Sequence, residues 1–253
     1  MATDVQTLRS YCDELLDASK FRDYCPNGLQ VEGKITVARL ATAVTANQSV
    51  LDAAVAWGAD ALLVHHGYFW RGEDAPVVGM KKRRLATLLH ADMNLFAYHL
   101  PLDAHATLGN NAQLGARLGF PAGEALNLED PTAVGTIAAL PEARGLRDLC
   151  RDLQALTGRE PLLIGDAERR VCNVAWCTGA AQGYIDLAAE RGAELYISGE
   201  VSEPTVHAAR EQGVAYIAAG HHATERYGVQ ALGAHLAETF GLAWTFLDCD
   251  NPV

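Results

Sequence analysis

The sequence contains no Cys-x-x-Cys pair, although it has six cysteines among its 253 residues. Zinc ribbons and thiol redox motifs depend on that spacing, so neither is expected. The polar, mixed segment 1–9 lacks the apolar stretch of a secretory signal. Because thiols without a targeting segment fit a reducing compartment, we expect a cytoplasmic protein.

Long apolar runs are also absent, since none approaches the roughly twenty residues that a membrane-spanning helix needs. We therefore expect no membrane partner. Basic residues are scarce: 20 Lys and Arg stand against 31 Asp and Glu, which gives a formal charge of −11. Such a surface repels phosphate backbones, so nucleic acid is not an expected partner. The one basic cluster, Lys81–Arg84, reads either as a solvated helix face or as a docking point for an anionic substrate.

Two common catalytic motifs are missing as well. Ser198 and Ser202 lack the Gly-x-Ser-x-Gly surroundings of a nucleophilic serine. The glycine-rich segment 179–183 follows an apolar run and could approach a phosphate through backbone amides. It has neither the full dinucleotide-binding spacing nor a Walker lysine, so it is a weak candidate.

The pattern that is present is an alternation of short apolar runs and amphipathic segments. A strand over 37–44, a helix over 49–57, Gly58-Ala59-Asp60 and a strand over 61–64 predict a parallel βαβ unit. Further helices are expected over 3–16, 81–91, 110–118, 146–156, 184–191, 207–212 and 224–240, and further strands over 29–32, 94–98, 134–140, 161–164, 171–177, 195–198, 214–218 and 243–247.

An internal repeat supports this organisation. Residues 37–66 align without a gap onto 171–200, and the matches include Gln48 with Gln182. Two βαβ units can resemble each other for physical reasons alone, but polar matches favour duplication. We therefore expect an α/β protein with two similar lobes, 1–128 and 129–253, and a metal cleft between them. The last helix and strand are able to pack back on the first lobe.

The segment His65-His66-Gly67 ends one predicted strand. Because neighbouring side chains on a strand point to opposite faces, two adjacent histidines serve one site only where the strand ends and turns. Gly67 is expected to supply that turn through its conformational freedom. The alternative is one buried and one exposed histidine with no common role.

Two further strand ends carry similar side chains, namely His99 with Asp103, and His221 with Glu225. Either pair alone is weak, because Asp103 could instead cap a helix and Glu225 could serve a helix dipole. Together the three strand ends predict a metal site with five ligands: His65, His66, Asp103, His221 and Glu225. His99 and His222 are either supporting groups around this site or ordinary histidines.

The number of ligands predicts the number of metals. One zinc or iron takes three or four protein ligands, whereas five with a bridging carboxylate suit two metals about 3.5–4 Å apart. A hydroxide held between two divalent cations is a nucleophile at neutral pH, so the set predicts hydrolysis. Histidine and carboxylate ligands suit Zn, Fe and Mn alike.

Four segments occur together in a familiar order: Pro26–Val31, His65-His66-Gly67, His99–Asp103 and Gly220–Glu225. In these the chain resembles the NIF-three-like family, also called GTP cyclohydrolase 1 type 2 homologues or YbgI-like proteins. The resemblance covers essentially the whole chain. It departs from many members at Leu100-Pro101-Leu102, which is less polar than the family pattern.

The resemblance implies two related α/β lobes and a toroidal homohexamer whose metal pairs face an internal cavity. It carries over the same five ligands, with Glu225 as the bridge. The catalytic candidates are Glu225 and His99, the latter because it could orient ligands or move protons. It also implies a small-molecule substrate, either a nucleotide or a related heterocycle. The implied reaction is hydrolytic opening of the ring, as for the guanine ring of GTP. The alternative is a ring-shaped metal-binding assembly or adaptor protein without turnover.

Overall fold

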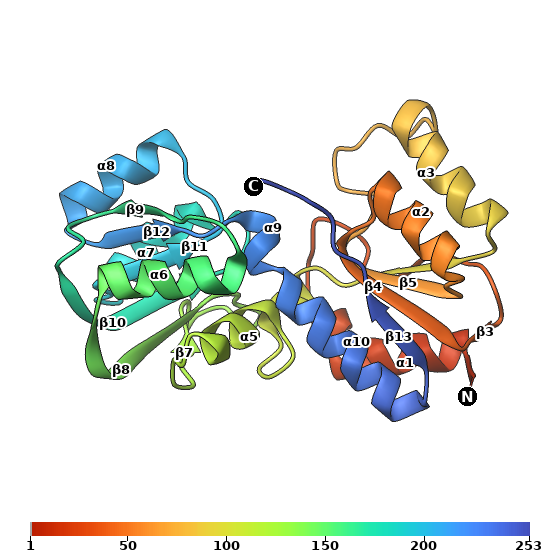
Figure 1. Cartoon of the computed structure of the whole chain (residues 1–253), viewed down its shortest axis with the longest axis horizontal. Coiled ribbons are helices and arrows are strands. Elements are labelled where there is room, and N and C mark those ends of the chain that lie inside the picture. Colours follow the sequence, from red (N-terminus) through yellow and green to blue (C-terminus); the bar gives the residue numbers. More distant parts are fainter. Residues whose placement is uncertain (1) are drawn as a thin grey trace. The chain divides into compact units, whose positions relative to one another are not determined.

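The computed structural model describes residues 2–253, which form an α/β protein of two compact units (Figure 1). The first unit comprises the chain up to Leu102 together with Gly228–Asp250, and the second comprises Asp103–Tyr227 with Asn251–Val253. Compared with the division into 1–128 and 129–253, residues 103–128 group with the second unit and 228–250 with the first. Among residues 2–253, no helix is both long and apolar enough to cross a membrane.

The first unit is built on a five-stranded sheet. Four strands run parallel, and the edge strand β2 is antiparallel to β6. The order across the sheet is β13 (Ala243–Phe246), β4 (Arg39–Thr45), β5 (Ala61–His66), β6 (Asn94–Ala97) and β2 (Gly28–Val31). Because β13 pairs with β4, the last strand of the chain belongs to the first sheet. The short strands β1 (Thr3–Asp4) and β3 (Thr36–Val37) pair separately.

Helices cover both faces of this sheet (Figure 1). On one face, α2 (Gln48–Trp57) and α3 (Gly79–His90) contribute Leu51 and Leu88 to a core shared with Leu62 of β5. On the other, α1 (Val5–Leu15) and α10 (Arg226–Phe240) lie side by side. The hydroxyl of Tyr11 there lies 2.7 Å from Nε2 of His235. The parallel pairing of β4 with β5 across α2 confirms the predicted βαβ unit. Two short segments complete the unit: η1 (Ala18–Lys20) and α4 (Leu100–Ala104), the latter ending in the second unit.

The second unit has a six-stranded sheet with three parallel strands at its centre. Its order is β7 (Glu124–Ala125), β8 (Thr136–Gly145), β10 (Arg170–Cys177), β11 (Leu195–Ser198), β12 (Ala215–Ala218) and β9 (Leu162–Ile164). The neighbours β8 and β9 are antiparallel to the central strands. The carboxyl ends of β10, β11 and β12 therefore meet at one edge, where ligands bind in such sheets.

The second sheet is also covered on both faces. The helices α5 (Asn110–Arg117) and α6 (Leu146–Thr157) share one core, to which α6 contributes Leu146, Leu149 and Leu153. The helices α7 (Ile185–Glu190) and α8 (Glu203–Gln212) share the other. Gly158, with a φ of 78°, ends α6 at the predicted residue. Because α5 packs on β10, the chain from Asp103 onward joins this unit. The short helices η2 (Gln182–Tyr184) and α9 (His221–Thr224) follow β10 and β12.

Two predicted helices differ from the observed ones. The helix expected over 224–240 is interrupted at Glu225, which ends α9 before α10 begins at Arg226. The helix expected over 207–212 begins earlier, at Glu203, because Ser202 and Thr205 form a capping box at its start. The other predicted elements agree with the structure to within a few residues.

Candidate metal centre

His65 is the second-last residue of β5, and its ring is buried with a fixed tautomer. Its Nδ1 lies 3.0 Å from the backbone carbonyl of Tyr98. Because a carbonyl oxygen can only accept, Nδ1 carries the proton and Nε2 of the neutral ring carries a lone pair. A metal-binding histidine is held in this way in most proteins.

His66 lies beside it, with ring centroids 4.6 Å apart and with Nδ1 3.2 Å from the hydroxyl of Thr45. Glycine was predicted at position 67 for its conformational freedom, but the φ of Gly67 is not positive. A Cβ at Gly67 would lie 2.2 Å from Oε1 of Gln30 and 2.6 Å from Cβ of Ala97. Gly67 is therefore required by the close approach of its neighbours rather than by its conformational freedom.

Gln30 explains part of the Pro26–Val31 motif. Its amide oxygen accepts from the backbone N–H of Tyr68 at 2.7 Å, and its amide nitrogen donates to the carbonyl of Pro26 at 2.8 Å. These bonds hold the loop that follows His66. The motif thus acts on the histidine pair through the backbone of the next loop.

His99 is the third imidazole of this unit. Its Nδ1 lies 2.7 Å from Oδ1 of Asp23, and its ring centroid is 5.0 Å from that of His65. Burial alone would raise the pKa of Asp23, but hydrogen bonds from His99, Asn27 and Leu100 and the charge of His99 lower it to about 2. The ionised carboxylate therefore holds the proton on Nδ1 of His99.

One ring nitrogen from each of His65, His66 and His99 lies within 4.8 Å of the other two. This spacing is close enough for one metal ion to contact more than one of them. Asp23 was not identified from the sequence, although it lies three residues before the Pro-Asn-Gly segment. Its partner Asn27 accepts from the backbone N–H of His99 at 2.7 Å.

Asp103 lies in the second unit and within α4, so it is not the helix cap that the alternative reading suggested. It is buried, and its Oδ1 accepts from the amide of Asn110 at 2.8 Å. Its carbonyl accepts from the amide of Asn111 at 3.2 Å, and Asn111 in turn accepts from the backbone N–H of Thr178 at 2.9 Å. The carboxylate is thereby fixed between α5 and the loop after β10.

His221 and Glu225 converge after β12, as their spacing of four predicted. Nε2 of His221 lies 3.2 Å from Oε2 of Glu225, and Nδ1 lies 2.7 Å from Oε1 of Glu200. Burial lowers the pKa of His221, but the bonds and charges of the two carboxylates outweigh it and raise the pKa to about 9. The surroundings therefore favour a positive charge. Glu200, which was not identified from the sequence, is the partner that orients His221.

Gly179 makes room for this carboxylate. With a φ of 71°, it adopts a conformation that favours glycine, and a Cβ there would lie 2.1 Å from Oε1 of Glu225. The glycine-rich segment after β10 therefore faces an acidic group, which does not suit a phosphate. Burial and the charges of Asp103 and Glu225 also raise the pKa of the Cys177 thiol well above its usual range.

His222 and Lys81 are the remaining sequence candidates. His222 is buried, and its backbone N–H donates to the carbonyl of Val253 at 3.0 Å. Lys81 opens the basic run in α3, and its Nζ lies 3.2 Å from Oε1 of Glu73. The donors as a whole are imidazole nitrogens and carboxylate oxygens, a set that suits zinc, iron and manganese.

Comparison with known proteins assigns the family. The family model described as Duf34/NIF3 (NGG1p interacting factor 3) matches residues 3–252. A Pseudomonas aeruginosa protein named GTP cyclohydrolase 1 type 2 homolog is 54% identical over 252 residues, which cover 100% of both chains. A protein of Escherichia coli (strain K12) with the same name is 51% identical over 97% of this chain and 98% of its own.

Solved structures agree with this assignment. The protein ybgI, described as of unknown function, is 47% identical with a TM-score of 0.94, over 99% of this chain and 100% of its own. Reduced HcgD from Methanocaldococcus jannaschii is 20% identical with a TM-score of 0.85, over 98% of this chain and 99% of its own, and shows the common fold. Because the family model spans nearly the whole chain and the relatives match over their full length, the chain belongs to the DUF34/NIF3 family.

Proposed function

We propose that the protein is a hydrolase that depends on two divalent metal ions per subunit. The ligands are the five residues named from the sequence: His65, His66, Asp103, His221 and Glu225. The observation that carries the proposal is that neighbouring groups orient imidazole and carboxylate side chains at the strand ends of each unit. His65 is held with Nε2 as its lone-pair atom, and the carboxylates of Glu200 and Glu225 lie 2.7 and 3.2 Å from the two ring nitrogens of His221.

The two units contribute different kinds of ligand. The first supplies neutral imidazoles, and the second supplies the carboxylates of Asp103 and Glu225 with one imidazole. Neither set alone offers both the charge and the number of donors that two divalent ions need. Glu225 is the residue proposed to bridge the ions, because its two oxygens can each serve one of them.

Metal ions held in this way would acidify a bound water and neutralise negative charge that develops on the substrate. His99 is proposed to move the proton. Because Asp23 fixes Nδ1–H of His99, Nε2 is the ring atom proposed to exchange the proton. Trp70 lies against the His99 ring at 5.0 Å, edge to face, and limits how far that ring can turn.

The proposed substrate is a nucleotide or a related heterocycle, opened as the guanine ring of GTP is opened by a cyclohydrolase. The names of the relatives support this class as the first to be tested, since they contain the words GTP cyclohydrolase 1 type 2 homolog. The proposed assembly is a homohexameric ring, on the resemblance described above. Sedimentation or light scattering measures the number of subunits directly.

The test compares wild type with Glu225→Gln, after purification without chelator. We expect about two metal ions per wild-type chain by mass spectrometry, and turnover of a nucleotide or pterin when manganese, iron or zinc is added. Glu225→Gln should lose one or both ions and the turnover. Glu211→Gln, an exposed change on α8 of the same unit, is the matched control and should lose neither.

One metal ion per wild-type chain, or full metal content and turnover in Glu225→Gln, would contradict the proposal. Two ions without turnover on any nucleotide, pterin or phosphoester would instead favour the metal-binding ring assembly without catalysis. The two functions are therefore separated by the same set of measurements.

A further inference from the structure

Two aromatic side chains of the first unit flank the His99 ring. The centroid of Trp70 lies 5.0 Å from that of His99, and the centroid of Tyr24 lies 6.3 Å from it. Trp70 also lies 5.9 Å from His66. The His99 side chain is 15% exposed, so solvent reaches it. A ligand that approaches His99 from solvent therefore passes next to Trp70 and Tyr24.

An unusual backbone conformation at Phe69 precedes Trp70. The φ of Phe69 is 65°, a value that aromatic residues rarely adopt. The indole N–H of Trp70 donates to the carbonyl of Gly67 at 3.1 Å, and its backbone N–H donates to Oε2 of Glu73 at 3.2 Å. Glu73 is itself paired with Lys81 at 3.2 Å. Strained backbone that is held in this way is concentrated at binding sites.

Arg71 follows Trp70 and is exposed. Its backbone N–H donates to the carbonyl of Tyr24 at 2.7 Å, and its Nη2 donates to the carbonyl of Asp23 at 3.0 Å. Among residues 2–253, no carboxylate forms an ion pair with its guanidinium group. Because a guanidinium has five N–H donors, most of them remain available to a ligand. Lys81 differs, since its charge is already paired with Glu73.

The Tyr24 ring connects Arg71 to the histidines. Its centroid lies 6.0 Å from Cζ of Arg71, within reach of a cation–π contact, and 6.3 Å from the centroid of His99. A ligand whose reactive end lies at His99 can therefore bring an anionic group to Arg71. Arginine binds a phosphate through two parallel N–H bonds, which gives it both affinity and a defined orientation.

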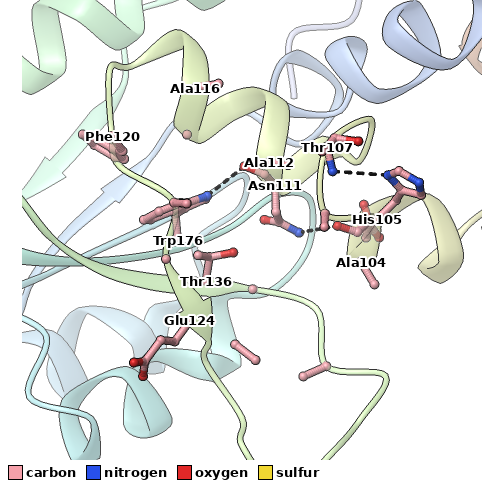
Figure 2. Close-up of a pocket in the computed structure, with 18 of the residues that line it drawn as sticks. Ala104, His105, Thr107, Asn111, Ala112, Ala116, Phe120, Glu124, Thr136 and Trp176 are labelled. Carbon is pink, nitrogen blue, oxygen red and sulfur yellow. Dashed lines mark hydrogen bonds between the residues drawn. The ribbon is translucent and has the colours of Figure 1, made fainter. Parts of the chain in front are cut away.

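The cavity of the second unit lacks such a cation. It has a volume of about 550 Å³ and is enclosed by α5, by the loop that carries His105 and by the β7 region that carries Glu124 (Figure 2). None of the lining residues that the structure describes is lysine or arginine. The cavity therefore supplies no cationic side chain to an anionic ligand, whereas the loop that carries Arg71 does.

We infer that Arg71 is a specificity-determining residue that binds a phosphate group of the substrate, while the histidines of the same unit face the group that reacts. The inference rests on the proposed function. It narrows the substrate class from nucleotides and related heterocycles to compounds that carry a phosphate. Trp70 and Tyr24 flank the part of the substrate between these two ends. A nucleotide is therefore bound more tightly than its nucleoside, and Arg71 accounts for the difference.

Calorimetric titration of the full chain with guanosine monophosphate (GMP) and with guanosine tests the inference, because the two ligands differ by one phosphate. The titrations are run on the protein as purified and again with manganese added. We expect wild type to bind GMP about ten-fold more tightly than guanosine. Arg71→Gln should weaken GMP binding about ten-fold and leave the affinity for guanosine within about two-fold, with or without manganese.

Two further variants locate the effect. Arg9→Gln makes the same change at an exposed position of α1 in the same unit, where Asp13 already pairs with the arginine at 3.5 Å. It should leave both affinities within about two-fold. Arg71→Lys keeps the charge but not the paired donors, so it should lose less GMP affinity than Arg71→Gln. Circular dichroism checks that each variant is folded.

Equal GMP affinity in Arg71→Gln and Arg9→Gln, or no binding of GMP to wild type, would contradict the inference. An equal loss of GMP and guanosine affinity in Arg71→Gln would also contradict it, since that result indicates a structural role through the carbonyl of Asp23. The proposed function fails differently, through the metal content and turnover of Glu225→Gln. Two ions and turnover in wild type, with a GMP affinity that does not depend on Arg71, would keep the hydrolase and remove the inference.

Discussion

The βαβ units of the first and second sheets contain equivalent hydrogen bonds at aligned positions. Asp60 accepts from the backbone N–H groups of Ala38 and Arg39 at 2.9 Å, just before β5. Glu194 accepts from those of Cys172 and Asn173 at 2.6 and 2.9 Å, just before β11. Both sets fall at the offset of the sequence repeat, as duplication of one unit would produce.

The same two units differ where their strands end. β5 ends in His65-His66, whereas the aligned positions after β11 are Gly199-Glu200. In the first unit the hydroxyl of Thr45 contacts His66, the last residue of β5. In the second unit the carboxylate of Glu200 contacts His221, which follows β12. The comparison teaches that a common scaffold keeps its internal hydrogen bonds while the residues at its binding edge change. One unit presents imidazole nitrogens at this edge, and the other presents carboxylate oxygens together with the imidazole of His221.

The largest expected effect is that of Gly179→Ala in the second unit. The added Cβ would meet Oε1 of Glu225 at 2.1 Å, and the positive φ adds strain, together about 2 kcal/mol or more. We expect the variant to displace Glu225 and lose metal. Gly183→Ala in the same segment meets nothing within 4 Å and should be neutral. Equal metal content in both variants would show that Glu225 is not needed.

The corresponding change in the first unit is Gly67→Ala, which we expect to destabilise the protein by about 1–3 kcal/mol. Its Cβ would lie 2.2 Å from Oε1 of Gln30 and 2.6 Å from the Cβ of Ala97, so the neighbours must move. The backbone strain expected at Gly179 is absent here, because the φ of Gly67 is not positive. Urea unfolding measures the effect. Adding Gln30→Ala should restore part of the stability, with Gln30→Ala alone as the reference. If Gly67→Ala is as stable as wild type, the loop after His66 is not tightly packed.

Glu200→Gln and Thr45→Val compare the partners of the two histidines. The first removes the charge that orients His221 and should weaken metal binding about ten-fold, as changes next to a ligand do. The second removes a neutral partner of His66 and should weaken it less than about three-fold. Competition with a chromogenic chelator measures both. A larger loss of metal affinity in Thr45→Val than in Glu200→Gln would contradict the greater importance given to the partner of His221.

The smallest effects are expected where the units agree, for Asp60→Asn and Glu194→Gln. Each should cost about 1–2 kcal/mol at neutral pH, because an amide oxygen accepts from the two backbone N–H groups more weakly than a charged carboxylate oxygen does. Burial raises the pKa of Asp60, but its bonds to Lys34, Ala38 and Arg39 outweigh this and lower it. The pKa of Glu194 is also lowered, chiefly by the N–H groups of Cys172 and Asn173.

The sign of the pH dependence follows from these lowered values. A depressed carboxyl pKa contributes stability above the unfolded-state pKa, and that contribution is lost as the pH falls through the folded-state pKa. The difference between wild type and either variant should therefore shrink below about pH 4. Urea unfolding at pH 7 and pH 3 measures it, and a constant difference would contradict the role of these carboxylates.

The sequence predicted the elements whose signals are local. The end of α6 at Gly158 and the convergence of His221 with Glu225 follow from glycine conformation and helical spacing. The supporting residues Asp23 and Glu200 were not predicted, because each contacts a histidine that lies far away along the chain. Such contacts depend on strand order, which no local pattern contains.

Other differences arise from packing. Gly67 carried a local signal for a turn, but the structure gives it a role that depends on the position of Gln30. The break at Glu225 was missed because the helical pattern continues through it. The grouping of 103–128 with the second unit follows from α5, whose core partners lie on β10. The five-ligand set stays a prediction that these contacts support.

Anomalous diffraction from crystals grown with manganese tests the central claim most directly. The account predicts two anomalous peaks about 3.5–4 Å apart, with a carboxylate oxygen of Glu225 bound to each and with His65 and His66 among the other ligands. A single peak, or a Glu225 side chain that points away from the His65-His66 pair, would contradict it.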